Sequence, residues 1–247
     1  MTTLQHHAER LAPHFDVTLP DGHGRFPVLI MLHGCGGMRA FQRAIADVAV
    51  KAGAAAVAID SYAPRRISRV AALASVCTGA RLRGPERAGD LFAALHWLRQ
   101  QSWAAHDRVA AIGWSHGSWT IMDALALRSG AEMERLTKLS ALPHEPLEGL
   151  KAALLVYPYT SFGSFCGRRD WRFNPRATAI IADQDYIVGP TRGALERQAN
   201  RCGMKLVTFE NTTHAFEDEH AEDPRVRFNP LATAREHAMI TEMVEAL

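Results

Sequence analysis

The segment Gly113-Trp114-Ser115-His116-Gly117 fits the pattern G-x-S-x-G, which presents a serine hydroxyl on a sharp turn between a strand and a helix. The apolar run Val109–Ile112 precedes it and a helix-forming run follows, so the required context is present. The flanking glycines fit this turn, because side chains there would collide with neighbouring backbone. The pattern therefore predicts a nucleophilic Ser115 rather than an ordinary turn serine.

A serine hydroxyl does not ionise near neutral pH, so a nucleophilic serine needs a neighbouring base. Twelve histidines are present, and His214 stands out because it follows an expected strand, Lys205–Glu210. Where such a turn carries the nucleophile, the acid and then the histidine come later in the chain. We expect His214 to be the base, with His220 as the reserve.

The acid should follow the expected strand Arg176–Ala182, and two aspartates compete there, Asp183 and Asp185. We favour Asp185, because it lies further into the loop, where it can reach an imidazole. Asp183 would then cap the turn, which is a common structural role for aspartate. The acid is expected to fix the tautomer of the histidine and to stabilise the imidazolium.

An oxyanion hole needs two backbone N–H groups, one of them from the residue after the nucleophile, which is His116. The other is expected in the glycine-rich loop His33-Gly34-Cys35-Gly36, with the amide of Cys35 as the best donor. A rival interpretation makes Cys35 a reactive thiol, although no base is placed for it in the sequence. The side chain of His33 is expected to brace its loop.

The surrounding sequence alternates apolar strand-like runs with helical runs. Strands are expected at Phe15–Leu19, Pro27–Leu32, Ala55–Ile59, Arg108–Ile112, Ala152–Tyr157, Arg176–Ala182 and Lys205–Glu210. Helices are expected at Phe41–Ala52, from Glu86, at Ser118–Ala126, at Pro190–Cys202 and at Leu231–Leu247. This alternation predicts one α/β domain over residues 1–247, with a mostly parallel sheet covered on both faces. Each candidate residue follows a strand, and ligands of such sheets bind beyond the carboxyl ends of the strands.

With these residues in place, the chain resembles the dienelactone hydrolase family of α/β-hydrolases. The segments that carry the resemblance are Leu32–Gly37, Arg87–Asp90, Ile112–Gly117, Asp183–Asp185 and Thr213–Phe216. The resemblance implies the α/β-hydrolase fold, the triad and the oxyanion loop at these positions. The founding enzymes of the family carry a cysteine nucleophile where this chain has Ser115, and a glutamate where it has Cys35. The family label therefore does not name the ester.

We expect a serine hydrolase that cleaves a small ester through an acyl-enzyme, without metal or cofactor. A thioesterase, a peptidase or an acyltransferase would use the same triad, and a non-catalytic relative is a further alternative. The substrate walls should come from two irregular segments, 61–85 and 158–175. Candidate substrate-binding residues there are Arg65, Arg66, Tyr159 and Trp171. The arginines would grip a carboxylate-bearing acyl compound, or would form ordinary ion pairs on a solvated rim.

The composition indicates which partners and which cellular compartment to expect. The net charge of +2 gives no global field toward nucleic acid or membrane, although all but four of the 28 basic residues are arginine. No leader or spanning segment is visible, so we expect a cytoplasmic protein with reduced cysteines, acting as a monomer or homodimer on a small molecule. The four cysteines show no metal-ligand spacing. Cys77 and Cys166 both lie in loop-like segments and could pair.

Overall fold

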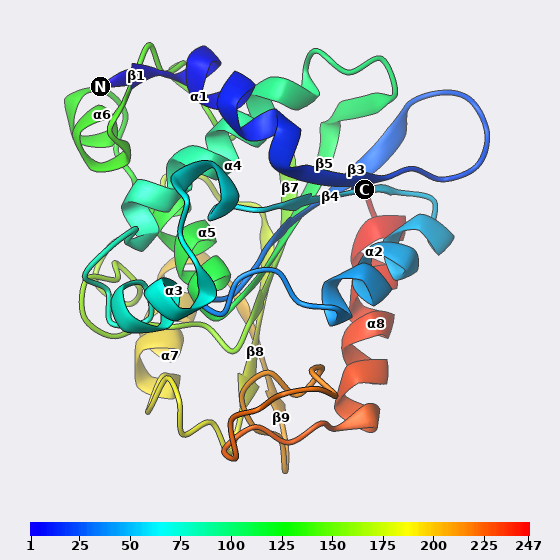
Figure 1. The fold of residues 1–247 in the computed structure, drawn as a ribbon, viewed down its shortest axis with the longest axis vertical. Coiled ribbons are helices and arrows are strands. Elements are labelled where there is room, and N and C mark those ends of the chain that lie inside the picture. The colour runs from blue at the N-terminus through cyan, green and yellow to red at the C-terminus, as the bar shows by residue number, and fades with distance from the viewer.

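The computed structural model describes all 247 residues, and a seven-stranded sheet runs through its centre with the order β2-β4-β3-β5-β7-β8-β9 (Figure 1). β2 pairs with β4 in an antiparallel sense, and all other neighbours are parallel. The strands are β2 (Phe15–Thr18), β3 (Phe26–Leu32), β4 (Ala55–Ile59), β5 (Ala104–Trp114), β7 (Leu150–Val156), β8 (Arg176–Ala182) and β9 (Lys205–Phe209). The predicted, mostly parallel α/β sheet is confirmed.

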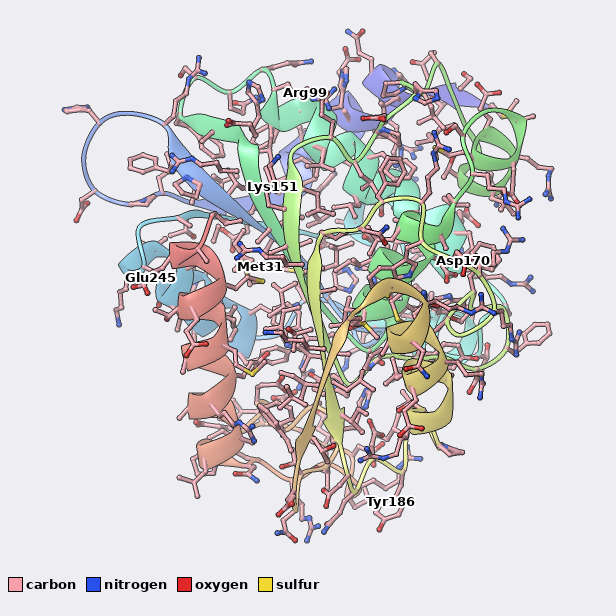
Figure 2. All side chains as sticks on the ribbon, turned by 180° about the vertical axis from the view of Figure 1, so that it is seen from behind. Met31, Arg99, Lys151, Asp170, Tyr186 and Glu245 are labelled. Carbon is pink, nitrogen blue, oxygen red and sulfur yellow. A yellow bond between two sulfur atoms is a disulfide. The ribbon has the colours of Figure 1, made fainter.

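Helices cover both faces of the sheet (Figure 1). One face carries α2 (Phe41–Lys51) and α8 (Pro230–Glu245), and the other carries α1 (Leu4–Leu11), α4 (Gly84–Leu98), α5 (His116–Ala126) and α7 (Arg192–Cys202). The side chains of β3 alternate between the two cores: Val28, Ile30 and Leu32 face α4 and α5, whereas Leu29 and Met31 face α2 and α8. Figure 2 shows Met31 beside α8. Double-sided burial explains why the strands are continuously apolar.

Two helices and a small two-stranded sheet that the sequence analysis left out lie on the α4 side. In α1, the buried residues Leu4, Ala8 and Leu11 recur at helical spacing, and the Thr3 side chain accepts a hydrogen bond from the His6 amide over 3.2 Å. Helix α6 (Ala131–Thr137) and the small parallel sheet of β1 (Thr2–Thr3) and β6 (Leu139–Ser140) complete this side. The spacing and the cap in α1 were visible in the sequence, so this helix was predictable.

The two segments expected to be irregular differ from each other. Residues 158–175 contain no helix or strand, whereas residues 61–85 hold a 3-10 turn at Ala63–Arg65 and helix α3 (Arg69–Ser75). The Ser68 side chain caps α3 by accepting from the Ala71 amide.

The suggested pairing of Cys77 with Cys166 is wrong, and so is the expectation that every cysteine is a free thiol. Cys77 forms a disulfide with Cys35, with the two Cα atoms 5.3 Å apart, whereas Cys166 is a buried free thiol beside α7. Chain-entropy arguments give a bond across 42 residues a stabilisation of about 4 kcal/mol. The disulfide also rules out the interpretation of Cys35 as a reactive thiol.

The parallel strands all point toward one end of the molecule. In Figure 2, Lys151 at the start of β7 lies at the opposite end from Tyr186, which follows β8. The loops that hold the candidate residues therefore gather at the end that Tyr186 marks. None of the helices is long and apolar enough to span a membrane.

Candidate active site

Ser115 occupies a strained turn between β5 and α5. Its backbone has φ of +52°, in the region that non-glycine residues rarely adopt, which is typical of a nucleophile held clear of the sheet. A Cβ on Gly113 would overlap the backbone of Gly117, and one on Gly117 would overlap the carbonyl oxygen of Leu32. Both glycines of the motif are therefore required by close backbone approach, as their spacing predicts.

Hydrogen bonds to the neighbouring strand hold this turn in place. The Ser115 amide donates to the carbonyl of Val156 over 2.9 Å, and the Ser118 hydroxyl bonds the carbonyls of Gly113 and Val156. The Ser115 side chain is left to face the cavity, with 6% of the residue exposed.

The structure brings Asp185, and not Asp183, to the ring of His214. Oδ2 of Asp185 lies 2.6 Å from Nδ1 of His214, and its Oδ1 accepts from the amides of Ile187 (2.9 Å) and Val188 (3.2 Å). This contact makes Nδ1 the protonated ring nitrogen, so Nε2 carries the lone pair. Asp183 accepts from the Thr212 amide over 2.9 Å and closes the turn after β9.

Ser115 and His214 line the same cavity of about 400 Å³, beyond the carboxyl ends of the strands. No hydrogen bond joins the hydroxyl to the ring in this structure; such catalytic contacts often tighten only when substrate binds. The Tyr157 ring packs against His214, with centroids 4.4 Å apart, and limits the movement of the imidazole. The reserve candidate, His220, is exposed and does not line the cavity.

Cys35 and His116, the two residues expected to supply the oxyanion amides, both lie close to Ser115. A Cβ on Gly34 would lie 3.6 Å from the Cβ of Ser115, so the loop that contains Cys35 lies directly against the nucleophile. The Cys35 amide donates no hydrogen bond within the protein. His116 is the first residue of α5, where a helix leaves its N–H groups without intrahelical partners. Both residues line the cavity.

A buried network beneath the oxyanion loop was not found by the sequence analysis. Nδ1 of His33 donates to the carbonyl of Gly34 (2.7 Å), and Nε2 accepts from the Ser61 amide (3.2 Å). Arg87, fully buried, donates to the carbonyl of His33 (2.8 Å) and lies 3.1 Å from Nδ1 of His116. His33 therefore braces its loop as expected.

Burial and the nearby charge of Arg87 keep both of these histidines neutral. Burial, followed by Arg87, lowers the pKa of His116 to about 3 and holds the pKa of His33 well below its usual value. Neutral rings suit the contacts just described, because His33 accepts a hydrogen bond at Nε2. Arg87 had entered the sequence analysis only through the family resemblance.

Of the four predicted substrate-binding residues, only Tyr159 lines the cavity. Arg65 is turned inward, where it makes two hydrogen bonds of 2.7 and 3.0 Å to the buried carboxylate of Asp90. Arg66 is exposed and outside the cavity, and Trp171 packs in the core with 6% of the residue exposed. These three predictions are wrong, because a loop position does not reveal which way its side chain points.

The arginines of the segment 158–175 also lie outside the cavity around Ser115. Arg168, Arg169 and Arg172 line a second, separate hollow beside Asp170, which Figure 2 shows near α7 and away from Tyr186. They therefore do not contribute to the wall around Ser115.

Three arginines do line the main cavity, and each is paired with a carboxylate. Arg39 contacts Asp218 (2.7 Å), Arg69 contacts Glu222 (3.4 Å) and Arg225 contacts Asp223 (2.6 Å). Arg39 and Arg225 were missed by the sequence analysis, although the acidic residues after His214 indicated that arginines could pair with them there. The pairing leaves the wall without an uncompensated positive charge.

Two buried carboxyls lie behind the histidine, and the sequence analysis did not single them out as a pair. Glu217 accepts from the Tyr157 hydroxyl over 2.9 Å, and Glu236 accepts from the Trp114 indole over 3.0 Å. Burial raises the pKa of Glu217 to about 7, and burial together with Glu217 raises that of Glu236 well above its usual value. No group of three or more metal-ligating side chains is arranged to hold a metal ion.

No protein-family model and no curated protein matches the chain by sequence. Solved structures do match. A dienelactone hydrolase-like promiscuous phosphotriesterase from metagenomic libraries has a TM-score of 0.67 at 19% identity, covering 94% of this chain and 92% of its own. Dienelactone hydrolase from Anabaena variabilis has a TM-score of 0.60 at 18% identity, covering 93% and 89%. Esterase 2 from Thermogutta terrifontis, phosphorylated by paraoxon, has a TM-score of 0.60 at 18% identity, covering 91% of this chain and 85% of its own.

The chain thus has the α/β-hydrolase fold, in the form shared by dienelactone hydrolases and related esterases. Because the identities are below 20%, these structural matches establish the common fold alone. The chemistry has to be inferred from the residues of the site.

Proposed function

We propose that the chain is a serine hydrolase that cleaves small carboxylic esters through an acyl-enzyme. The observation that carries this proposal is that Ser115, on its strained turn, and His214 line one cavity, with the His214 ring held by Asp185 at 2.6 Å. A nucleophile, a base and the group that orients the base are the recurring parts of acyl-transfer catalysis.

The reaction begins when Nε2 of His214 removes the proton of the Ser115 hydroxyl as its oxygen attacks the ester carbonyl. The amides of Cys35 and His116 stabilise the negative charge that develops on the carbonyl oxygen. The imidazolium, stabilised by Asp185, then returns the proton to the departing alcohol. Water attacks the acyl-serine in the second half, again through His214, and releases the carboxylic acid.

The charges in the cavity favour a neutral ester. Arg39 and Arg225 each engage a carboxylate through two guanidinium nitrogens, and Arg69 lies 3.4 Å from Glu222, so each lining arginine already has an acidic neighbour. Trp119 and Tyr159, with ring centroids 4.8 Å apart, add an aromatic wall, and Leu73 and Val226 add aliphatic surface. The preferred acyl or alcohol group is therefore uncharged and apolar.

The first test compares wild type with Ser115→Ala on a short-chain aryl ester. Wild type should hydrolyse it, and Ser115→Ala should retain only the background rate. Treatment with paraoxon should add one phosphoryl group to wild type and none to the variant, as mass spectrometry can show. Equal turnover in both proteins would remove Ser115 from the mechanism.

The same triad serves thioesterases, peptidases and acyltransferases, so substrate preference needs its own test. Esters, thioesters and peptides of matched acyl group, in neutral and anionic forms, should be ranked by kcat/KM. The proposal expects neutral esters to rank first. A clear preference for a thioester or peptide would replace it with one of these alternatives, and a failure to react with any of them would favour a non-catalytic protein.

A further inference from the structure

The covalent bond between Cys35 and Cys77 joins the oxyanion loop to the wall of the cavity. Cys35 supplies one of the two free amides beside Ser115, and Cys77 follows helix α3. Arg69 and Leu73 of that helix line the same cavity as Ser115. The disulfide therefore links the amide of Cys35, proposed for catalysis, to helix α3, whose side chains are proposed to contact the substrate.

Cys35 has a sulfur, a backbone carbonyl and a backbone amide, and only the first two have partners in the protein. Its sulfur is bonded to Cys77, and its carbonyl accepts a hydrogen bond of 3.0 Å from the Tyr62 hydroxyl. Its amide has no partner in the protein. An oxyanion donor needs this arrangement, because its amide must be held in place and must also have no hydrogen-bond acceptor within the protein.

The sequence around Cys35 makes such fixation necessary. Gly34 precedes it, and Gly36 and Gly37 follow. Glycine gives the unfolded and unrestrained loop more backbone freedom than any other residue. Gly37 has φ of +80°, and a Cβ there would lie 3.4 Å from the Tyr62 ring, so the loop turns back tightly over Tyr62. Without the disulfide, the loop would keep only hydrogen bonds: those to the Gly34 carbonyl from His33 (2.7 Å) and from the Gly37 amide (3.2 Å), and that from Tyr62 to Cys35. No covalent restraint would then hold Cys35 itself.

We propose that the Cys35–Cys77 disulfide is a positioning element of the oxyanion hole, so that its reduction lowers the turnover number. The inference rests on the proposed function. The second amide, from His116, belongs to the rigid start of α5 and does not depend on the bond. Reduction therefore weakens one of two donors and leaves the nucleophile and base unchanged.

The reduction itself is a two-electron exchange with an added dithiol. A thiolate of the reagent attacks one sulfur, forming a mixed disulfide and releasing the other cysteine as a thiolate. The second thiol of the reagent then attacks the mixed disulfide and releases the remaining protein thiolate. The products are two protein thiols, which take up two protons, and the cyclic disulfide of the reagent. Removing the reagent and adding oxidised dithiol reverses the exchange.

The test uses the full chain with both other cysteines replaced, Cys166→Ala and Cys202→Ala, so that only the disulfide responds. The oxidised and dithiothreitol-reduced forms are compared on the aryl ester, with thiol titration to show two free thiols after reduction. Near-UV circular dichroism at the assay temperature reports whether the fold survives. We expect kcat to fall about 10- to 100-fold and KM to change less than threefold, because a donor acts mainly in the transition state. Reoxidation should restore kcat.

Tyr62→Phe provides a second measurement that does not depend on reduction. It keeps the disulfide and removes only the hydrogen bond to the Cys35 carbonyl, and kcat should fall several-fold with KM unchanged. Equal kcat in oxidised and reduced protein would overturn the inference, while the activity of the oxidised form would still support the proposed function. Unfolding on reduction, combined with an unchanged Tyr62→Phe, would show that the bond serves stability alone. An oxidised protein without turnover that depends on Ser115 would overturn both.

Discussion

The indole Nε1 of Trp114 donates a hydrogen bond to Oε1 of Glu236 over 3.0 Å, directly behind the proposed nucleophile. Trp114 precedes Ser115, and Glu236 lies in α8. Glu217, three residues after His214, shares this buried region and bonds Tyr157. One oxygen of each carboxyl has no donor among the other side chains, so a proton shared between the two carboxyls would supply the missing hydrogen bond.

This carboxyl pair predicts a specific pH dependence of stability. The folded pKa of Glu217, about 7, lies above its unfolded value, so the folded state binds the extra proton between about pH 4.5 and 7. The free energy of unfolding contributed by the pair must then fall as pH rises through this window, by up to about 1.4 kcal/mol per pH unit for one proton. Glu217→Gln should remove most of that fall, because it removes the carboxyl whose pKa burial raises into this window.

The measurement is urea unfolding of wild type and Glu217→Gln between pH 5 and 8. Other titrating groups, such as His116, are common to both proteins and cancel in the difference. Glu245→Gln, at the exposed end of α8, is the control and should follow wild type. Parallel curves for wild type and Glu217→Gln would mean that Glu217 does not bind the extra proton in the folded state.

Asp185→Asn should lower kcat by roughly 10³- to 10⁴-fold, because an amide no longer fixes the tautomer of His214 or stabilises its cation. Asp183→Asn is the matched control, two residues away. Its side chain accepts only the Thr212 amide, a bond that the asparagine oxygen can keep, so kcat should stay within about threefold. Steady-state kinetics on the aryl ester decide between them; a larger loss in Asp183→Asn would reverse the assignment.

Arg65→Ala should affect stability rather than substrate binding. It removes two hydrogen bonds from the fully buried carboxylate of Asp90, leaving His7 as its remaining partner at 2.8 Å. Breaking such a buried pair costs about 3 kcal/mol or more. Arg66→Ala, at the adjacent exposed position, should change the unfolding free energy by less than about 0.5 kcal/mol. A raised KM with unchanged stability in Arg65→Ala would restore its predicted role in the substrate site.

Gly117→Ala should destabilise the protein by about 3 kcal/mol or more, since its Cβ would overlap the Leu32 carbonyl in a backbone that cannot move aside. Gly193→Ala is the control. It lies on the exposed side of α7, where the nearest atom to a new Cβ is the flexible end of Arg197 at 3.6 Å. Helix propensity should make this change neutral or stabilising by up to about 1 kcal/mol. Thermal unfolding measures both changes. An unchanged melting temperature in Gly117→Ala would contradict the prediction.

The strand and turn positions were predictable because they depend on residues close together in the chain. The bounds expected for β4 and β8 agree with the structure, and the helix after Ser115 differs only in starting at His116 rather than Ser118. Apolar runs bounded by glycine or aspartate carry this information locally. Chain order then placed Ser115, Asp185 and His214 at the same end of the sheet.

What only the tertiary structure decided was the partner of each side chain. The sequence did not indicate that Cys77 meets Cys35, that Arg65 turns inward to Asp90, or that Glu217 meets Glu236. Each pair joins residues from separate elements, and the distance between them depends on strand order and on the paths of the loops. Local pattern determines which groups stand at the end of each strand, whereas packing in three dimensions determines which of them touch.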